Sequence, residues 1–197
     1  MLAVSTSARS YHHGDLRTRL LDVAEELLEE GGVGALSLRE VARRADVSHN
    51  APYRHFASKD ELLAALAASG FDGLAASRAD ISDPRNALVE SGLAYVRFAL
   101  EHRALFRLMF SGAAGGESGE SVASEASAAA MMRGAFGDDT PGDALISSWS
   151  FVHGLAGLLL DDQVPAGLRV GRDDETLARD VLTLTARALD AGLADTP

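Results

Sequence analysis

Residues 37–59 constrain the fold of this chain most, because they carry the signals of two short helices joined by a tight turn. Ser37 and Glu40 have the capping-box spacing that opens a helix. An apolar face at helical spacing follows, made of Leu38, Val41 and Ala42. Val47 reads as a buried turn residue, and Ser48 can cap a second helix. The segment therefore predicts a helix-turn-helix.

The predicted second helix is rich in polar side chains, namely His49, Asn50, Tyr53, Arg54 and His55. Ala51 and Phe56 are available for the core, and Ser58 with Glu61 opens a third helix by the same capping spacing. In a helix-turn-helix the second helix enters the major groove of DNA. An ordinary helical hairpin has the same layout, so the layout alone does not decide between the two.

The residue order within this segment carries a family resemblance. Residues 41–48 read VARRADVS and residues 53–59 read YRHFASK. This pattern resembles the DNA-binding domain of TetR-type transcriptional regulators, from Tyr11 to about Leu74. Asp46 stands where a turn glycine is usual, Asn50 where glycine is frequent, and Pro52 where an aliphatic residue is usual. We interpret the three as a variant recognition surface, since Asp tolerates unusual turn geometry and a proline costs least in the first helical turn.

DNA recognition needs groups that reach base edges and groups that contact phosphates. His49 and Asn50, at the start of the recognition helix, are the predicted base readers. The resemblance implies phosphate contacts by Tyr53, His55 and Lys59, and Arg43 and Arg44 are left open. Ser48 serves equally well as a cap alone. The predicted DNA-binding set is Ser37, Arg39, Ser48, His49, Asn50, Tyr53, Arg54, His55 and Lys59.

Net charge does not argue against this prediction once its distribution is considered. The 197-residue chain has a formal net charge of −11. Residues 37–59, however, contain five basic side chains against two acidic ones. DNA binding needs a local basic face and not a basic protein. The chain has no cysteine, which excludes disulfides and fits a reducing cytoplasm.

Hydrophobic periodicity predicts an all-α chain. We expect a disordered arm at 1–14, a three-helix DNA-binding domain at 15–80, and a ligand-binding and dimerisation domain at 81–197. Residues 144–160 are uncharged, and we expect a buried helix there and not a membrane span. Helices are expected at 15–30 with a stop at Gly31 and Gly32, and at 59–79, 85–110, 125–136, 143–160 and 173–191, with a loop at 111–124.

The second domain carries a shorter motif. Trp149, His153 and Gly154 resemble the C-terminal domain of a TetR subgroup named for a Trp-His-Gly motif. Ligand pockets are mostly apolar with a few polar groups. The side chains that can line one here are His102, Phe106, Met109, Met131, Met132, Phe136, Trp149 and His153. The alternative is that these residues form ordinary core.

The last two predicted helices have the features of a dimer interface. Gly154 and Gly157 allow a neighbouring backbone to come close. An apolar stripe follows helical spacing at Leu177, Val181, Leu184 and Ala188. We expect these helices to form a four-helix bundle with those of a second copy.

The sequence thus predicts a dimeric repressor that binds a palindromic operator in double-stranded DNA and is released by a small apolar ligand. It predicts no catalytic site, cofactor, metal site or membrane partner, since phosphate-loop, dinucleotide and nucleophile motifs are missing and His12 and His13 lack metal-site spacing. The alternative is a helical ligand-binding or interaction protein with a degraded DNA-binding domain.

Overall fold

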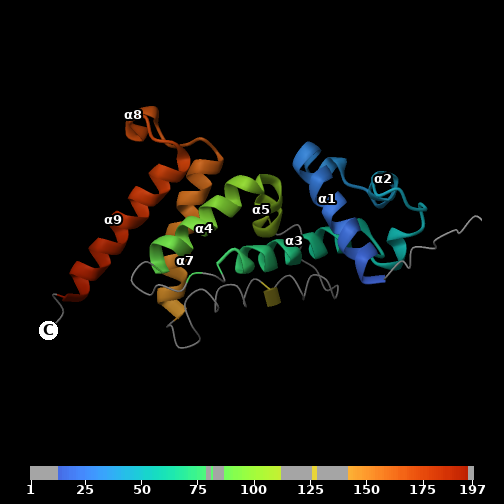
Figure 1. Ribbon diagram of the computed structural model, residues 1–197, viewed down its shortest axis with the longest axis horizontal. Helices are drawn as coiled ribbons and strands as arrows, with labels where there is room; N and C mark the ends of the chain where they lie inside the picture. The colour runs from blue at the N-terminus through green and yellow to red at the C-terminus, as the bar shows by residue number, and fades with distance from the viewer. Residues whose placement is uncertain (1–12, 79–80, 82–86, 112–125, 128–141, 195–197) are drawn as a thin grey trace, which may run out of the picture. The chain divides into compact units, whose positions relative to one another are not determined.

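The computed structural model describes residues 13–78, 81, 87–111, 126–127 and 142–194, and all regular secondary structure in these ranges is helical (Figure 1). The predicted all-α class is therefore confirmed. The chain divides into two compact units, Met1–Leu62 and Leu63–Pro197. The predicted loop at 111–124 and helix at 125–136 lie almost wholly outside the described residues, as does the arm up to residue 12.

The first helix of the N-terminal unit, α1 (His13–Ala35), packs through an apolar face that includes Leu20, Ala24, Leu27 and Leu28. It is interrupted at Gly32, where φ is 67° and ψ is −172°. Glycine adopts this region without the steric cost that a Cβ would bring. The predicted stop at Gly31 and Gly32 is thus a kink, and the helix continues for a short piece to Ala35.

The second helix, α2 (Leu38–Arg44), buries Leu38, Val41 and Ala42, which confirms the predicted apolar face. The turn after it is made by Asp46, whose φ of 54° lies in the left-handed region. Asp and Asn reach that region more readily than other non-glycine residues. Asp46 therefore takes the conformation that a turn glycine would supply.

The predicted second helix of the motif is a short 3₁₀ helix, η1 (Pro52–Arg54), preceded by turns. In an α-helix capped by Ser48, the first intrahelical bond would run from the N–H of residue 52 to the Ser48 carbonyl. Proline has no N–H. The Ser48 carbonyl instead accepts a tighter bond from Ala51 N–H at 2.9 Å. The expectation of an α-helix capped by Ser48 is therefore wrong, and Pro52 lies instead in the first turn of the 3₁₀ helix.

The third helix, α3 (Lys59–Ala76), begins with the capping residues that the sequence predicts. Ser58 Oγ accepts a hydrogen bond from Glu61 N–H at 3.2 Å. Glu61 Oε2 in turn accepts one from Ala57 N–H at 2.7 Å. The first bond satisfies an N–H group that a helix start leaves without a partner, and the second fixes the residue before the cap.

The C-terminal unit is built around α4 (Ala87–Glu101), which packs against α7 (Gly142–Leu160) and α9 (Asp174–Ala194). A short helix, α8 (Ala166–Arg169), lies between α7 and α9 in the sequence. A Cβ added at Gly92 on α4 would lie 2.6 Å from Cδ2 of Leu182 on α9, so glycine permits this close packing.

The single helix predicted at 85–110 is wrong, because the chain bends at His102, with φ −119° and ψ 59°. A separate helix, α5 (Arg103–Phe110), follows and buries Leu105, Phe106, Leu108 and Met109. The bend has no glycine or proline to signal it, and it aims the apolar face of α5 into the core.

Helix α7 is long and apolar enough to cross a membrane by length and composition, criteria that a core helix of a soluble protein also meets. Only 28% of its apolar window is buried within the chain. The expectation of a buried helix is therefore met on one face only.

Candidate nucleic-acid interface and aromatic cluster

The start of α2 presents two of the predicted DNA-binding residues. Ser37 is the N-cap, and its Oγ accepts a hydrogen bond from Glu40 N–H at 3.1 Å. The Glu40 carboxylate accepts from Arg43, with Nε at 2.9 Å and Nη2 at 2.5 Å, instead of reaching back to Ser37. Arg39 is exposed in the first turn. Ser37 thus has a structural role as a cap, while Arg39 projects into solvent.

The turn and η1 expose most of the other predicted contacts. Ser48, His49, Asn50 and Arg54 are exposed, and Tyr53 is 48% exposed. His55 is half-buried, and Pro52 and Phe56 are buried. The N-cap of η1 is Ala51, with no side-chain capping bond, so the predicted Ser48 cap is not formed there. Polar side chains thus project from a short segment whose apolar residues anchor it.

Phe56 also contacts a residue outside the predicted DNA-binding set. The guanidinium carbon of Arg17, on α1, lies 5.4 Å from the centroid of the Phe56 ring. A cation over an aromatic face is attracted by the ring quadrupole. The contact fastens the end of the 48–56 segment to α1. Because 39 positions separate the two residues in the sequence, no local pattern indicates it.

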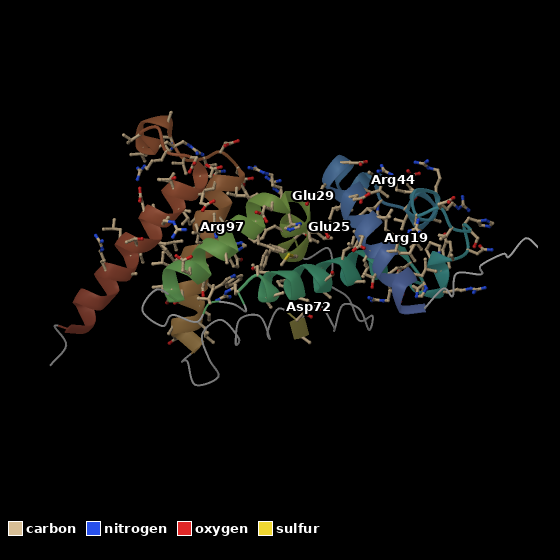
Figure 2. The ribbon with its side chains drawn as sticks, in the orientation of Figure 1. Arg19, Glu25, Glu29, Arg44, Asp72 and Arg97 are labelled. Carbon is tan, nitrogen blue, oxygen red and sulfur yellow. The ribbon has the colours of Figure 1, made fainter. Side chains whose placement is uncertain are left out.

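The five cations of residues 37–59 differ in what they contact. Arg43 pairs with Glu40 as described, and Arg44 (labelled in Figure 2) donates to both carboxylate oxygens of Glu30 at 2.9 and 2.5 Å. The hydrogen bond from Arg44 lowers the pKa of Glu30. Among the described residues, Arg39 and Arg54 are the two cations of this segment that make no ion pair or hydrogen bond through their side chains. They are the ones free to meet an anion.

Lys59, the fifth cation, donates from Nζ to the backbone carbonyl oxygen of Val33 at 2.6 Å. Val33 follows the kink at Gly32, so the bond joins the start of α3 to the end of α1. An ammonium group has three protons. One is used by Val33, and two are left for other acceptors.

The C-terminal unit contains an aromatic cluster, which we define as Tyr95 on α4, Phe106 and Phe110 on α5, and Trp149 and His153 on α7. Tyr95 is buried, and its hydroxyl oxygen lies 2.9 Å from Nδ1 of His153. Trp149 Nε1 donates to the same oxygen at 3.3 Å. A buried tyrosine hydroxyl and a tryptophan N–H normally find such partners.

The rings of the cluster surround the His153 imidazole. Phe106 stacks on it, with centroids 5.5 Å apart and planes 26° apart. Phe110 meets it edge-on at 4.6 Å, and the Trp149 ring lies at 5.3 Å. Burial lowers the pKa of His153, and burial also raises the pKa of Tyr95. Both groups are therefore held in their neutral forms near pH 7.

The predicted ligand-binding residues separate into three groups. Phe106, Trp149 and His153 come together in the cluster. Met109 packs elsewhere, since a Cβ at Gly70 would lie 2.6 Å from its sulfur, and His102 packs against Phe98 with centroids 4.7 Å apart. Met131, Met132 and Phe136 lie outside the described residues. Tyr95 and Phe110 belong to the cluster but not to the predicted set, although a hydroxyl within a strongly apolar helix already indicates a buried partner.

Within the described residues, no group of three or more His, Asp or Glu side chains is arranged to hold a metal ion.

Two family models match the chain. Residues 20–66 match the model for bacterial regulatory proteins of the tetR family, and residues 88–193 match the model for the tetracyclin repressor-like C-terminal domain. Neither description names a Trp-His-Gly subgroup, so that finer assignment stays a prediction.

The relatives agree with the models. The HTH-type transcriptional repressor Rv3405c of Mycobacterium tuberculosis is 36% identical over 52 residues, which cover 26% of this chain and 28% of that protein. The match thus spans about a quarter of the curated relative. A solved structure of a protein of unknown function from Rhodococcus sp. RHA1 is 36% identical, with a TM-score of 0.69, over 92% of this chain and 98% of that one.

A further solved structure shares the fold alone. AibR, in complex with isovaleryl coenzyme A and operator DNA, is 18% identical with a TM-score of 0.59, over 84% of this chain and 95% of that one.

Proposed function

The chain belongs to the TetR family of bacterial regulatory proteins, and from that premise we propose that it is a cytoplasmic, DNA-binding transcriptional regulator. We propose further that it is a repressor, because the curated relatives that match its N-terminal unit include proteins named as repressors. It acts by binding DNA and not as an enzyme.

One observation carries the DNA-binding proposal. Arg39 and Arg54 are exposed and make no ion pair with the described residues, and they belong to the same motif as the exposed His49, Asn50 and Tyr53. Arginine binds phosphates and the edge of guanine, and Asn binds adenine. The motif therefore presents both positioning and base-reading groups.

The salt dependence of binding to a random-sequence duplex tests this proposal without knowledge of the operator. Each phosphate contact contributes about 0.9 to the slope of log K against log salt concentration. The double variant Arg39→Ala/Arg54→Ala should lower the slope by roughly 2. The control is Arg172→Ala, which removes an equally cationic side chain paired with Asp180 in the other unit. An unchanged slope in the double variant would remove these residues from the interface.

The dimer is proposed from the exposed apolar face of α7 and α9. Ile146 is 60% exposed, Leu158 is 45% exposed and Leu184 is 70% exposed. A Cβ at Gly154 or Gly157 would meet nothing within 4 Å. Large exposed apolar surface on a folded chain marks an interaction site. A two-fold dimer would present two recognition motifs, and hence a palindromic operator is expected.

The effector is proposed to bind at the aromatic cluster. Three of its five residues come from the predicted ligand set, and its polar groups lie among aromatic rings, as is usual for small-molecule sites. AibR, which shares the fold, binds an acyl coenzyme A together with DNA. A ligand regulates DNA binding only if it prefers one conformation over the other.

The η1 helix favours one other function. Because Pro52 shortens the recognition helix, the chain is alternatively a helical ligand-binding protein whose DNA-binding domain is degraded. The random-duplex experiment separates the two, since this alternative expects no salt-dependent binding at all.

A further inference from the structure

Three side chains of the aromatic cluster form a hydrogen-bonded chain with a fixed direction. The indole N–H of Trp149 can only donate. The Tyr95 oxygen, 3.3 Å away, is therefore the acceptor of that bond. The Tyr95 hydroxyl has one proton, and the next group within reach is Nδ1 of His153 at 2.9 Å. The question is which of these two groups donates to the other.

The burial of Tyr95 decides the direction. If Nδ1 carried the proton, both Trp149 and His153 would donate to the tyrosine oxygen. The tyrosine proton would then have no acceptor among the described residues, in a side chain that is only 2% exposed. A buried donor without an acceptor is costly. Tyr95 therefore donates to Nδ1, and the imidazole proton is on Nε2.

The hydrogen bonds from Trp149 to Tyr95 and from Tyr95 to His153 also oppose protonation of His153. An imidazolium would carry protons on both nitrogens, so Nδ1 could no longer accept from Tyr95. The surrounding rings of Phe106, Phe110 and Trp149 also solvate a positive charge less well than water does. The imidazole is thus a neutral donor. No described residue accepts a hydrogen bond from its Nε2.

From this arrangement we propose that the effector is a neutral carbonyl compound with an apolar or aromatic body, whose carbonyl oxygen accepts a hydrogen bond from Nε2–H of His153. The proposal rests on the proposed function for the existence of an effector, and it adds the chemical class. A carboxylate is a poorer fit, because it would draw a second proton onto the imidazole and break the bond from Tyr95. A hydrocarbon is also poorer, since it makes no hydrogen bond with Nε2–H.

The first experiment tests whether Tyr95 donates to His153, and it needs neither DNA nor ligand. The ¹⁵N chemical shifts of the two imidazole nitrogens distinguish a protonated nitrogen from a bare one. We expect His153 to be protonated on Nε2 alone at neutral pH, and Tyr95→Phe to produce a mixture of the two neutral tautomers. Protonation on Nδ1 in the wild-type chain would overturn the proposal.

Ligand class is tested with three probes of similar shape, namely acetophenone, benzoate and ethylbenzene, by calorimetry. Acetophenone should bind at least fivefold more tightly than the other two, as expected for about one hydrogen bond. His153→Phe should abolish this preference, while the control His102→Phe, outside the cluster, should retain it. Equal binding of the three probes, or binding of none, would overturn the proposal. If the wild-type protein does not bind DNA at all, the proposed function is contradicted. The preference among the three probes is measured without DNA and would still be observed.

Discussion

Lys59 Nζ donates a hydrogen bond to the backbone carbonyl oxygen of Val33 at 2.6 Å, and so the only lysine of the chain joins α3 to the end of α1. The bond holds the segment that follows the Gly32 kink. The two remaining protons of the ammonium group can still serve the phosphate contact that the family resemblance implies.

Lys59→Met is therefore expected to have two separate effects. It should lower the free energy of unfolding by up to about 1 kcal/mol, because the Val33 carbonyl oxygen loses the Lys59 donor and keeps only the 3.3 Å bond from Leu36 N–H. It should also lower the salt slope of DNA binding by about 1, because one phosphate contact is lost. Urea denaturation measures the first effect and a salt titration the second. Lys59→Arg is the control, and an unchanged slope in Lys59→Met would assign Lys59 to structure alone.

A second prediction concerns the turn of the helix-turn-helix. Asp46 has a φ of 54°, which costs a residue with a Cβ about 1 kcal/mol relative to glycine. Asp46→Gly should raise the free energy of unfolding by up to about 1 kcal/mol, and Asp46→Ala should lower it. Chemical denaturation measures both variants. If Asp46→Gly instead destabilises the protein, the aspartate side chain stabilises the fold by more than its left-handed backbone conformation costs.

The dimer proposal is tested by placing a charge on the exposed part of the predicted α9 stripe, since Leu177 at its start is buried within the protomer. Leu184 is 70% exposed, so Leu184→Glu should leave the protomer folded. It should yield monomers in analytical ultracentrifugation, because a carboxylate would be buried between two copies. The control is Leu168→Glu, which changes a similarly exposed leucine on α8. A dimer that survives Leu184→Glu would place the interface on another surface.

The fold was predictable where local signals agree with each other. The caps at Ser37 and Ser58 and the apolar face of α2 are confirmed, because caps and periodicity act within one helix. The bend at His102 was missed since no local residue requires it. The α-helix from Ser48 was wrongly predicted, although Pro52 gave the signal, because the one hydrogen bond that the proline removes is the first of that helix.

The candidate sites were predictable to a lesser degree. Exposure of Arg39, His49 and Asn50 follows from polar residues in a short motif. The bond between Tyr95 and His153 joins residues 58 positions apart, and the ion pair of Arg44 with Glu30 joins residues 14 apart. Pairing of this kind is decided by tertiary packing, which no local spacing reveals.

The lowered pKa of His153 gives a pH prediction. Burial holds its folded-state pKa below the usual value near 6.5. As the pH falls, the unfolded chain therefore takes up this proton first, and folded stability is lost from about pH 6.5 downward. His153→Phe should be less sensitive to pH than the wild type between pH 7 and 5.5. Denaturation midpoints across this range provide the measurement, and identical profiles for His153→Phe and wild type would contradict it.

Selection from a random duplex library tests whether this protein binds DNA as a sequence-specific dimer. We expect enrichment of a palindrome whose half-sites lie about one helical turn apart or a multiple of it. We also expect Asn50→Ala to select a more degenerate half-site while binding persists, because a base contact and not a phosphate contact is lost. Recovery of no preferred sequence by the wild-type protein, at salt concentrations where it still binds duplex, would contradict sequence-specific binding.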